Sequence, residues 1–206
     1  MNILLHPTYF PDISHFVGIT NAESVMFEVE DNYQKQTFRN RTTIYAANGK
    51  LILSVPVVFT QKYRQKFKDV KIANDTNWQS QHWKSLQSAY RTSPFFEFYE
   101  DEFRPLFTYK ETYLLDLNFK CLKIILSCLL LDLKFTKTES YKKTVNNITD
   151  FRHLVDTKQE QIQQFSTYTQ VFNNKHGFIG NLSILDLLFN EGTNALNYLQ
   201  SQKLSL

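Results

Sequence analysis

The hydrophobic pattern at the start of the chain changes period within twenty residues. Residues 2–5 contain a consecutive apolar run, which predicts a short buried strand. Two prolines in residues 6–11 prevent that strand from continuing as ladder or helix. Asp12 or Ser14 can then cap a helix that runs to about residue 21, with apolar side chains at helical spacing.

A second strand is predicted over residues 24–29. Strand, helix and strand in fewer than thirty residues favour parallel pairing of the two strands. Ligands of open α/β sheets bind beyond the carboxyl ends of parallel strands. His6, Tyr9 and residues 30–33 follow those ends, so the pattern predicts a site there.

The remaining pattern predicts one hairpin and then mainly helices. Asn48-Gly49 is a tight-turn signal between the strand-like segments 42–45 and 51–57. Short strands are predicted over residues 70–72 and 134–138, and a loop over 145–150. Helices are predicted over 77–91, 113–131, 181–189 and 193–200. One more helix is predicted to begin at Pro94, with Ser93 as its cap.

These elements predict a single α/β domain over residues 1–206. Residues 1–75 are expected to form a small mixed or parallel sheet with a β-hairpin, and residues 76–206 a largely helical half packed against it. A chain of 206 residues is long enough for one sizeable core, and no linker or internal repeat divides it.

Composition and charge narrow the classes of partner. The net charge of +3 is mild and gives no concentrated basic face, so a nucleic-acid partner is not expected. The longest apolar stretch, residues 122–133, is too short and too often interrupted to insert in a membrane. With no signal peptide in the first residues and only two cysteines, seven positions apart, a reducing cytoplasm is the expected location. A small anionic or sugar substrate is the expected partner, and the oligomeric state is left open.

A charged segment, residues 30–41, carries the densest candidate chemistry. If residues 38–42 are extended, Arg39 and Arg41 point to the same side of the chain. Two guanidinium groups on one side match the oxygens of a phosphate or carboxylate. A solvated edge strand, whose charges deter edge pairing, is an equally good interpretation of this segment.

His6 is the candidate general acid or base, with Asp31 or Glu30 as the group that orients it or shares its proton. A loop histidine bonded to the backbone is the structural alternative. No metal site is predicted, because the five histidines and two cysteines show no ligand spacing. The chain also lacks a phosphate-binding glycine loop and a dinucleotide turn, so the cofactor is left undetermined.

Several stretches together resemble the WbqC-like protein family. They are residues 6–11, 32–41, 48–49, 55–57, 82–86, 89–91, 94–96, 168–172 and 182–192, in an order and spacing that are more specific than any single piece. The opening departs from the family pattern H-Q-P-x-Y-x-P-W-x-G-Y-F: the glutamine is absent, Asp12 replaces the tryptophan and Ser14-His15 stands for Gly-Tyr. A glycine-containing segment found before the C-terminal motif of longer members is missing, which makes this a short form. The resemblance implies a role in bacterial surface-polysaccharide biosynthesis, but no catalytic assignment.

Residues and resemblance together lead to three hypotheses. The first is a transferase that acts on an activated sugar or phosphate-bearing precursor, and the second is a non-catalytic protein that binds a glycan precursor or a partner. The third is a nucleotidylyltransferase-like domain, because His6 and His15 are similar to the phosphate-contacting histidines of those enzymes, although the glycine for close backbone approach is absent. The candidate substrate-binding residues are Tyr9, Tyr33, Lys35, Gln36, Arg39, Asn40, Arg41, His82, Trp83 and Arg91. For His82 to Arg91, an aromatic packing stripe on a helix is the more common arrangement.

Overall fold

A small parallel sheet opens the fold in the computed structural model, which describes residues 1–60, 64–157 and 162–205. Strands β1 (Asn2–Leu5) and β2 (Ser24–Phe27) are parallel, with each residue of β1 opposite one of β2. β7 (Phe135–Lys137) joins the far side of β2, and β8 (Thr149–Asp150) joins β1. The strand order is therefore β7-β2-β1-β8, and the predicted parallel pairing of the first two strands is confirmed.

Helix α1 (Ile13–Thr20) connects β1 to β2, as its capping signal predicts. The side chain of Asp12 caps it, with Oδ1 accepting hydrogen bonds from the backbone N–H and the Nδ1 of His15 at 2.9 and 2.7 Å. Ile13 and Phe16 are fully buried, so α1 packs against one face of the sheet and contributes to the core. The carboxylate of Asp12 occupies the N-terminus of this helix, the position where many α/β proteins hold a phosphate.

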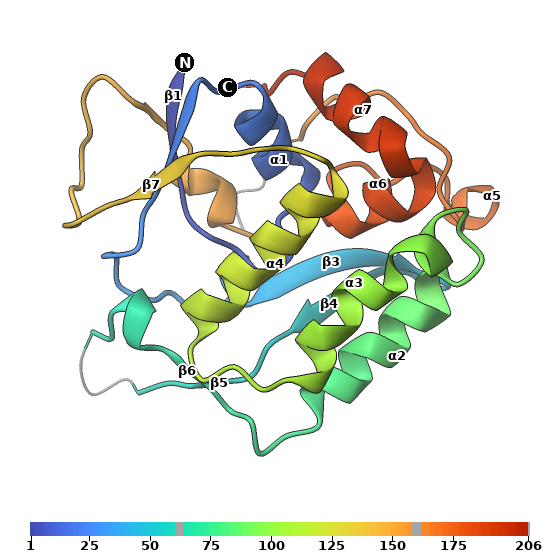
Figure 1. The fold of residues 1–206 in the computed structure, drawn as a ribbon, viewed down its shortest axis with the longest axis horizontal. Coiled ribbons are helices and arrows are strands. Elements are labelled where there is room, and N and C mark those ends of the chain that lie inside the picture. Colours follow the sequence, from blue (N-terminus) through green and yellow to red (C-terminus); the bar gives the residue numbers. More distant parts are fainter. Residues whose placement is uncertain (61–63, 158–161, 206) are drawn as a thin grey trace.

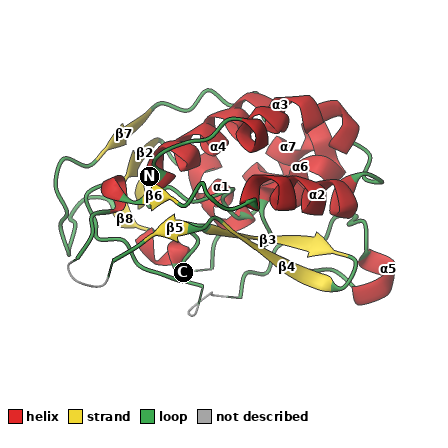
Figure 2. Ribbon diagram, turned by 90° about the horizontal axis from the view of Figure 1, so that it is seen from below, coloured by secondary structure: helices red, strands yellow, loops and turns green. Residues whose placement is uncertain are grey.

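The predicted hairpin forms a second, separate sheet. β3 (Arg41–Ala46) and β4 (Gly49–Ser54) are antiparallel, and Gly49 takes a positive φ of 98° at the turn, which glycine adopts without strain. A further antiparallel pair, β5 (Val57–Val58) and β6 (Lys71–Ile72), follows it. In Figure 2 the hairpin lies beneath the helices, away from the parallel strands.

Most of the helices lie in the part of the chain that follows residue 76. They meet in an aromatic core in which the ring of Phe189 contacts those of Tyr90, Phe96 and Phe103. In Figure 1, α4 crosses in front of the molecule with α2 and α3 beside it. The helices are α2 (Trp78–Tyr90), α3 (Phe96–Thr108), α4 (Leu114–Cys128), α5 (Asn173–His176), α6 (Ile184–Glu191) and α7 (Ala195–Ser201), with 3-10 turns at Phe67–Asp69, Arg152–Val155 and Gly192–Asn194.

The predicted fold class, a mixed α/β domain with an N-terminal parallel sheet and a helical second half, is confirmed. Two local predictions are wrong. α3 begins at Phe96, and the hydroxyl of Ser93 donates back to the carbonyl of Tyr90 instead of capping it. The predicted loop 145–150 contains β8, which is too short to leave a period in the sequence. Within the described ranges, no helix combines the length and apolar character needed to cross a bilayer.

Candidate active site

The strand order creates a topological switch point between β1 and β8. From β1 the chain moves to β2 on one side, whereas from β7 it crosses over to β8 on the other side. The connections that leave β1 and β8 therefore diverge, and α/β proteins bind ligands in the crevice that this divergence leaves. A cavity of about 350 Å³ lies there, which we call the switch-point cavity. Its lining residues are His6, Asp31, Gln34, Arg39, Tyr141, Asp150, Arg152, His153, Val155 and Asp156.

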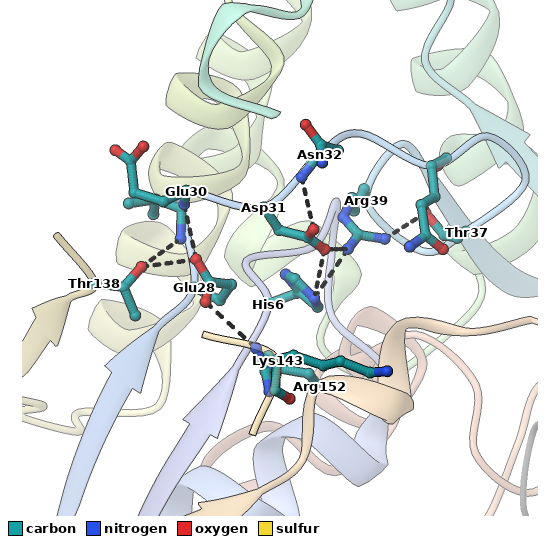
Figure 3. A network of polar contacts seen from close by, with 12 residues as sticks. His6, Glu28, Glu30, Asp31, Asn32, Thr37, Arg39, Thr138, Lys143 and Arg152 are labelled. Carbon is teal, nitrogen blue, oxygen red and sulfur yellow. Dashed lines mark hydrogen bonds and ion pairs between the residues drawn. The ribbon is translucent and has the colours of Figure 1, made fainter. Parts of the chain in front are cut away.

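Three buried side chains form the inner wall of this cavity. Nη2 of Arg39 donates to Oδ2 of Asp31 at 2.8 Å and to Nε2 of His6 at 2.9 Å. Oδ2 of Asp31 lies 3.5 Å from Nε2 of His6, which closes a triangle of contacts (Figure 3). His6 follows β1 directly, whereas Asp31 and Arg39 belong to the segment between β2 and β3.

His6 is a neutral imidazole in this arrangement. Burial lowers its pKa well below the ordinary value, and the nearby charge of Arg39 lowers it further, although the backbone of Glu28 opposes part of the shift. The hydrogen bond leads to the same conclusion: a guanidinium N–H can only donate, so Nε2 of His6 must accept and carries no proton. A neutral histidine with a lone pair on Nε2 has the protonation state of a general base.

Arg39 retains hydrogen-bonding capacity although it is almost fully buried. Its Nε is buried without a hydrogen-bond partner among the described residues, and its Nη1 makes only a long contact of 3.4 Å to the hydroxyl of Thr37. Burial lowers the pKa of Arg39, and the charge of Asp31 opposes this shift. Since arginine remains protonated in proteins, Arg39 is a fixed positive charge with donors left for a ligand oxygen.

The second arginine of the cavity, Arg152, is bound on every side. Its Nε and Nη2 bind the two carboxylate oxygens of Asp150 at 2.9 and 2.6 Å, and its Nη1 and Nη2 also donate to the carbonyls of Lys142 and Lys143. Nη1 lies 3.5 Å from Oε2 of the buried Glu28. Arg152 therefore organises the wall of the cavity, and it has few donors left for a ligand.

The cavity carries both signs of charge. Each arginine is paired with an aspartate, Arg39 with Asp31 and Arg152 with Asp150, and Asp156 adds a third carboxylate. This differs from the anion site that the sequence predicted, in which the guanidinium groups of Arg39 and Arg41 lie on one side of the chain. In the part of the chain that the structure describes, no three His, Cys, Asp or Glu side chains come together in a group that could hold a metal ion.

Of the predicted catalytic residues, the structure brings His6 and Asp31 together and separates Glu30 from them. The carboxylate of Glu30 binds Nζ of Lys68 at 2.8 Å and points away from His6 in Figure 3. Its backbone carbonyl accepts a hydrogen bond from Lys66. Glu30 thus ties the segment 30–41 to the turn that carries these lysines.

Arg39 and Arg41 do not form the predicted pair of forks. The chain turns at residues 38–39, and the strand begins only at Arg41, so the condition of an extended segment fails. Arg39 is buried against His6 and Asp31, whereas Arg41 is not among the residues that line the cavity. The two charges are nevertheless near one neighbour, because both lower the pKa of Tyr33, which burial raises to about 12.

Tyr9 and His82 form a separate buried pair outside the cavity lining. The hydroxyl of Tyr9 lies 3.0 Å from Nδ1 of His82, and both rings pack near Trp78. Burial lowers the pKa of His82 to about 4. This contact joins the segment after β1 to α2, so it packs the two together.

The other predicted substrate-binding residues also lie outside the cavity lining. Most of them have packing contacts of their own. Tyr33 packs against Phe59 and Phe67, Lys35 lies over the ring of Phe59, Asn40 donates to the carbonyl of Val55, Trp83 packs against Phe96 and Phe107, and the carbonyl of Gln36 accepts from Thr157. Arg91 is exposed at the end of α2.

Sequence reasoning missed the half of the cavity that β8 contributes. Asp150, Arg152 and His153 lie at and after the carboxyl end of β8, at the position equivalent to that of His6 after β1. The one signal in the sequence is Asp150-Phe151-Arg152, in which two residues of opposite charge flank an apolar one. Without the strand, that spacing does not distinguish a site from a solvated turn.

Comparison with known proteins shows the family of this chain. The chain is 25% identical over 226 residues to the uncharacterized protein Rv1507c of Mycobacterium tuberculosis, and the alignment covers 96% of each chain. No solved structure matched the chain. The model of the WbqC-like protein family matches residues 6–163, a range that begins at His6 and contains Asp31, Arg39 and Arg152 but ends before the C-terminal stretch 168–192. Because this match spans more than half of the chain, the protein belongs to the WbqC-like protein family.

Proposed function

We propose that the protein is a transferase that moves a group from an activated sugar or phosphate-bearing donor onto a hydroxyl or amino group in bacterial surface-polysaccharide biosynthesis. One observation carries the proposal: a neutral histidine, held by a buried Arg39–Asp31 pair, lines a cavity at the switch point of a parallel sheet. A polysaccharide setting comes from the family resemblance.

His6 is the general base in this proposal. The proton of the acceptor hydroxyl passes to Nε2 of His6 while the acceptor oxygen bonds to the transferred group. The bond between that group and the donor phosphate breaks, and its electron pair stays on the phosphate oxygen. Oδ2 of Asp31, 3.5 Å from Nε2, then stabilises the imidazolium that has formed.

Arg39 has two tasks in this step. In the structure its Nη2 donates to Nε2 of His6, so this hydrogen bond must break before Nε2 can accept a proton. A donor phosphate that binds the spare N–H groups of Arg39 draws the guanidinium toward itself and frees the imidazole. Activation of the base is thereby coupled to binding of the donor.

A non-catalytic binding protein is the second candidate, and the same hydrogen bond favours it. Nε2 of His6 accepts a hydrogen bond from Arg39, so its lone pair is already occupied. A ligand can therefore bind in the cavity while His6 is not available as a base. The two candidates differ in whether loss of His6 abolishes turnover or only alters binding.

The nucleotidylyltransferase alternative has less support. That chemistry places a phosphate at the strand-to-helix turn, where it meets the N-terminus of the first helix. Here the carboxylate of Asp12 caps α1 and binds His15, the second histidine of the predicted pair. A phosphate at this point would meet a negative charge.

The test is a donor screen with the purified full-length chain. Nucleotide sugars with UDP, GDP, dTDP and CMP carriers are incubated with saccharide and amine acceptors, and released nucleotide is measured. We expect one carrier class to raise the melting temperature and to release nucleotide. His6→Gln should lower the release at least about 100-fold, the usual scale for loss of a general base, while donor binding persists.

His82→Gln is the matched control. Both histidines are buried and both have a lowered pKa, but His82 binds Tyr9 outside the cavity. It should retain the turnover of the parent chain per folded molecule. Equal turnover in His6→Gln and His82→Gln would reject His6 as the base and leave the binding candidate. If no nucleotide sugar stabilises the chain at millimolar concentration, the transferase proposal fails.

A further inference from the structure

No helix among the described residues covers one of the two faces of the parallel sheet. Side chains alternate between the two faces of a strand, and Ile3, Val25 and Phe27 point into the core that α1 and α4 cover. Leu4 and Met26, on the opposite face, line a second cavity of about 780 Å³. We call it the sheet-face cavity, and its volume is more than twice that of the switch-point cavity.

The topology explains why this face is open. Right-handed crossovers that run in opposite directions along a sheet cover opposite faces. The crossovers from β1 to β2 and from β2 to β7 carry helices, α1 in the first and α4 in the second, whereas the last one, from β7 to β8, consists of the irregular residues 138–148. A parallel crossover usually contains a helix that would cover the face. Here the segment 138–148 swings out at the left of Figure 1 and lines the cavity instead.

The chemistry of the lining matches a neutral, polyhydroxylated ligand. Eight of the sixteen lining residues carry a hydroxyl or a side-chain amide, groups that both donate and accept hydrogen bonds. Four more, such as Met26 and Ile148, are apolar and match the C–H faces of a sugar ring. Of the four charged residues of this lining, Glu28 lies beside Arg152 and the ammonium group of Lys137 lies over the ring of Phe119 on the covered face, which leaves Glu139 and Lys142, whose charges cancel.

The two cavities share a wall. Glu28 lines the sheet-face cavity and Arg152 lines the switch-point cavity, and their charged groups lie 3.5 Å apart. Glu28 is buried and fixed by the hydroxyl of Thr138 and the backbone N–H of Glu30, each at 2.8 Å. Arg152 also donates a hydrogen bond to the carbonyl of Lys142, which lines the larger cavity, and lies over the ring of Tyr141, which lines the smaller one.

We propose that the sheet-face cavity binds a neutral saccharide, the acceptor or its neighbouring sugar, and presents it across the Glu28–Arg152 wall to His6. The assignment as acceptor rests on the transferase proposal above, whereas the binding of a neutral saccharide does not. A transferase needs room for two substrates, and in this proposal the smaller cavity, with its paired charges, binds the phosphate-bearing donor.

The experiment measures saccharide binding without any turnover. Methyl β-D-glucoside, N-acetylglucosamine and lactose are titrated into the full-length chain, with glycerol as the polyol control, and binding is followed by saturation-transfer NMR. Thr136→Trp puts a bulky indole into the cavity, since Thr136 lines it and is exposed in β7 opposite Met26. Ser54→Trp is the matched control, an exposed hydroxyl residue in β4 outside the lining.

We expect at least one of these saccharides to bind more tightly than glycerol. Thr136→Trp should weaken that binding at least tenfold, and Ser54→Trp and His6→Gln should leave it unchanged. Binding that survives Thr136→Trp but is lost in His6→Gln would overturn the proposal, because the saccharide would then occupy the switch-point cavity. Binding of none of the saccharides would overturn it as well. Saccharide binding without turnover for any donor would reject the transferase but retain this site.

Discussion

Two buried polar clusters in this protein have opposite designs. The first is the triangle of His6, Asp31 and Arg39 on the wall of the switch-point cavity. The second surrounds Asp186 of α6, which is fully buried and lies among α2, β3 and the segment that precedes α5. Both bury a carboxylate, but they differ in what each carboxylate contacts.

The Asp186 cluster is saturated. Its two carboxylate oxygens accept hydrogen bonds from the hydroxyls of Tyr90 and Tyr168 at 2.9 and 2.6 Å, and from the amide of Gln170 at 2.9 Å. The hydroxyl of Tyr90 also accepts from the backbone N–H of Tyr45, which ties α2 to β3. Burial raises the pKa of Asp186, and its hydrogen bonds oppose part of this shift.

We interpret this difference as one between a structural role for the Asp186 cluster and the proposed functional role of the triangle. Every donor around Asp186 is used, and no surface of the cluster faces a cavity described here. The triangle, in contrast, opens on a cavity and keeps a buried N–H of Arg39 without a partner among the described residues. A buried donor without a partner costs free energy of folding, which a ligand can recover. The predictions below test this contrast, beginning with the largest effect.

Arg39→Met should have the largest effect. It leaves the carboxylate of Asp31 buried without its cation, which typically costs about 3 to 5 kcal/mol of the free energy of unfolding. The double variant Arg39→Met/Asp31→Leu removes both charges and should regain most of that stability in urea unfolding. The double variant should nevertheless not bind the nucleotide-sugar donor. A stable double variant that still binds donor would make the triangle structural, like the Asp186 cluster.

Asp186→Asn should have the next largest effect and lower the free energy of unfolding by about 3 kcal/mol. In either orientation of the new amide, its NH2 group faces a hydroxyl or amide group that donates to Asp186 in the parent chain. Urea unfolding measures the loss. At a temperature where the variant is folded, donor binding per folded molecule should equal that of the parent chain. A selective loss of binding in the folded variant would mean that the sealed cluster also serves the site.

The pH dependence of stability should reveal the buried histidines. The pKa of His82 is lowered to about 4 in the folded chain, whereas the ordinary pKa of histidine is 6.5. Between these two values His82 binds a proton in the unfolded chain but not in the folded chain. Stability therefore falls as the pH drops from 6.5 toward 4. His82→Gln should remove about 2 kcal/mol of the change between pH 7 and pH 5, measured by urea unfolding at each pH. His6→Gln should flatten the same curve, because its pKa is lowered as well. An unchanged slope in both variants would contradict the neutral state of these rings.

Arg91→Gln should have the smallest effect. Arg91 is exposed at the end of α2, outside both cavities, although the sequence made it a candidate for anion binding. The free energy of unfolding should change by less than about 0.5 kcal/mol, and donor affinity should not change. A marked loss of affinity would extend the site beyond the switch-point cavity.

Local signals in the sequence were sufficient for much of the fold. The helix cap at Asp12 or Ser14, the turn at Asn48-Gly49 and the strands predicted over 2–5 and 24–29 depend on neighbours along the chain. Each is confirmed, with Asp12 as the cap and with the second strand ending at Phe27. β8 was missed because it has only two residues and is defined by its pairing with β1, which is distant in sequence. The site divides in the same way. His6 and Asp31 follow strands that the pattern predicts, whereas Arg152 depends on the strand that it does not.

The shortness of β8 has a consequence for how the molecule moves. One side of the switch-point cavity is built on a strand that shares only two register positions with its neighbour, whereas β1 and β2 share four. Segments with few ladder hydrogen bonds separate transiently from the body of a protein at less cost than global unfolding. We therefore expect amide hydrogens around β8 to exchange with deuterium before those of β2, so that fluctuation is concentrated on one side of the switch-point cavity.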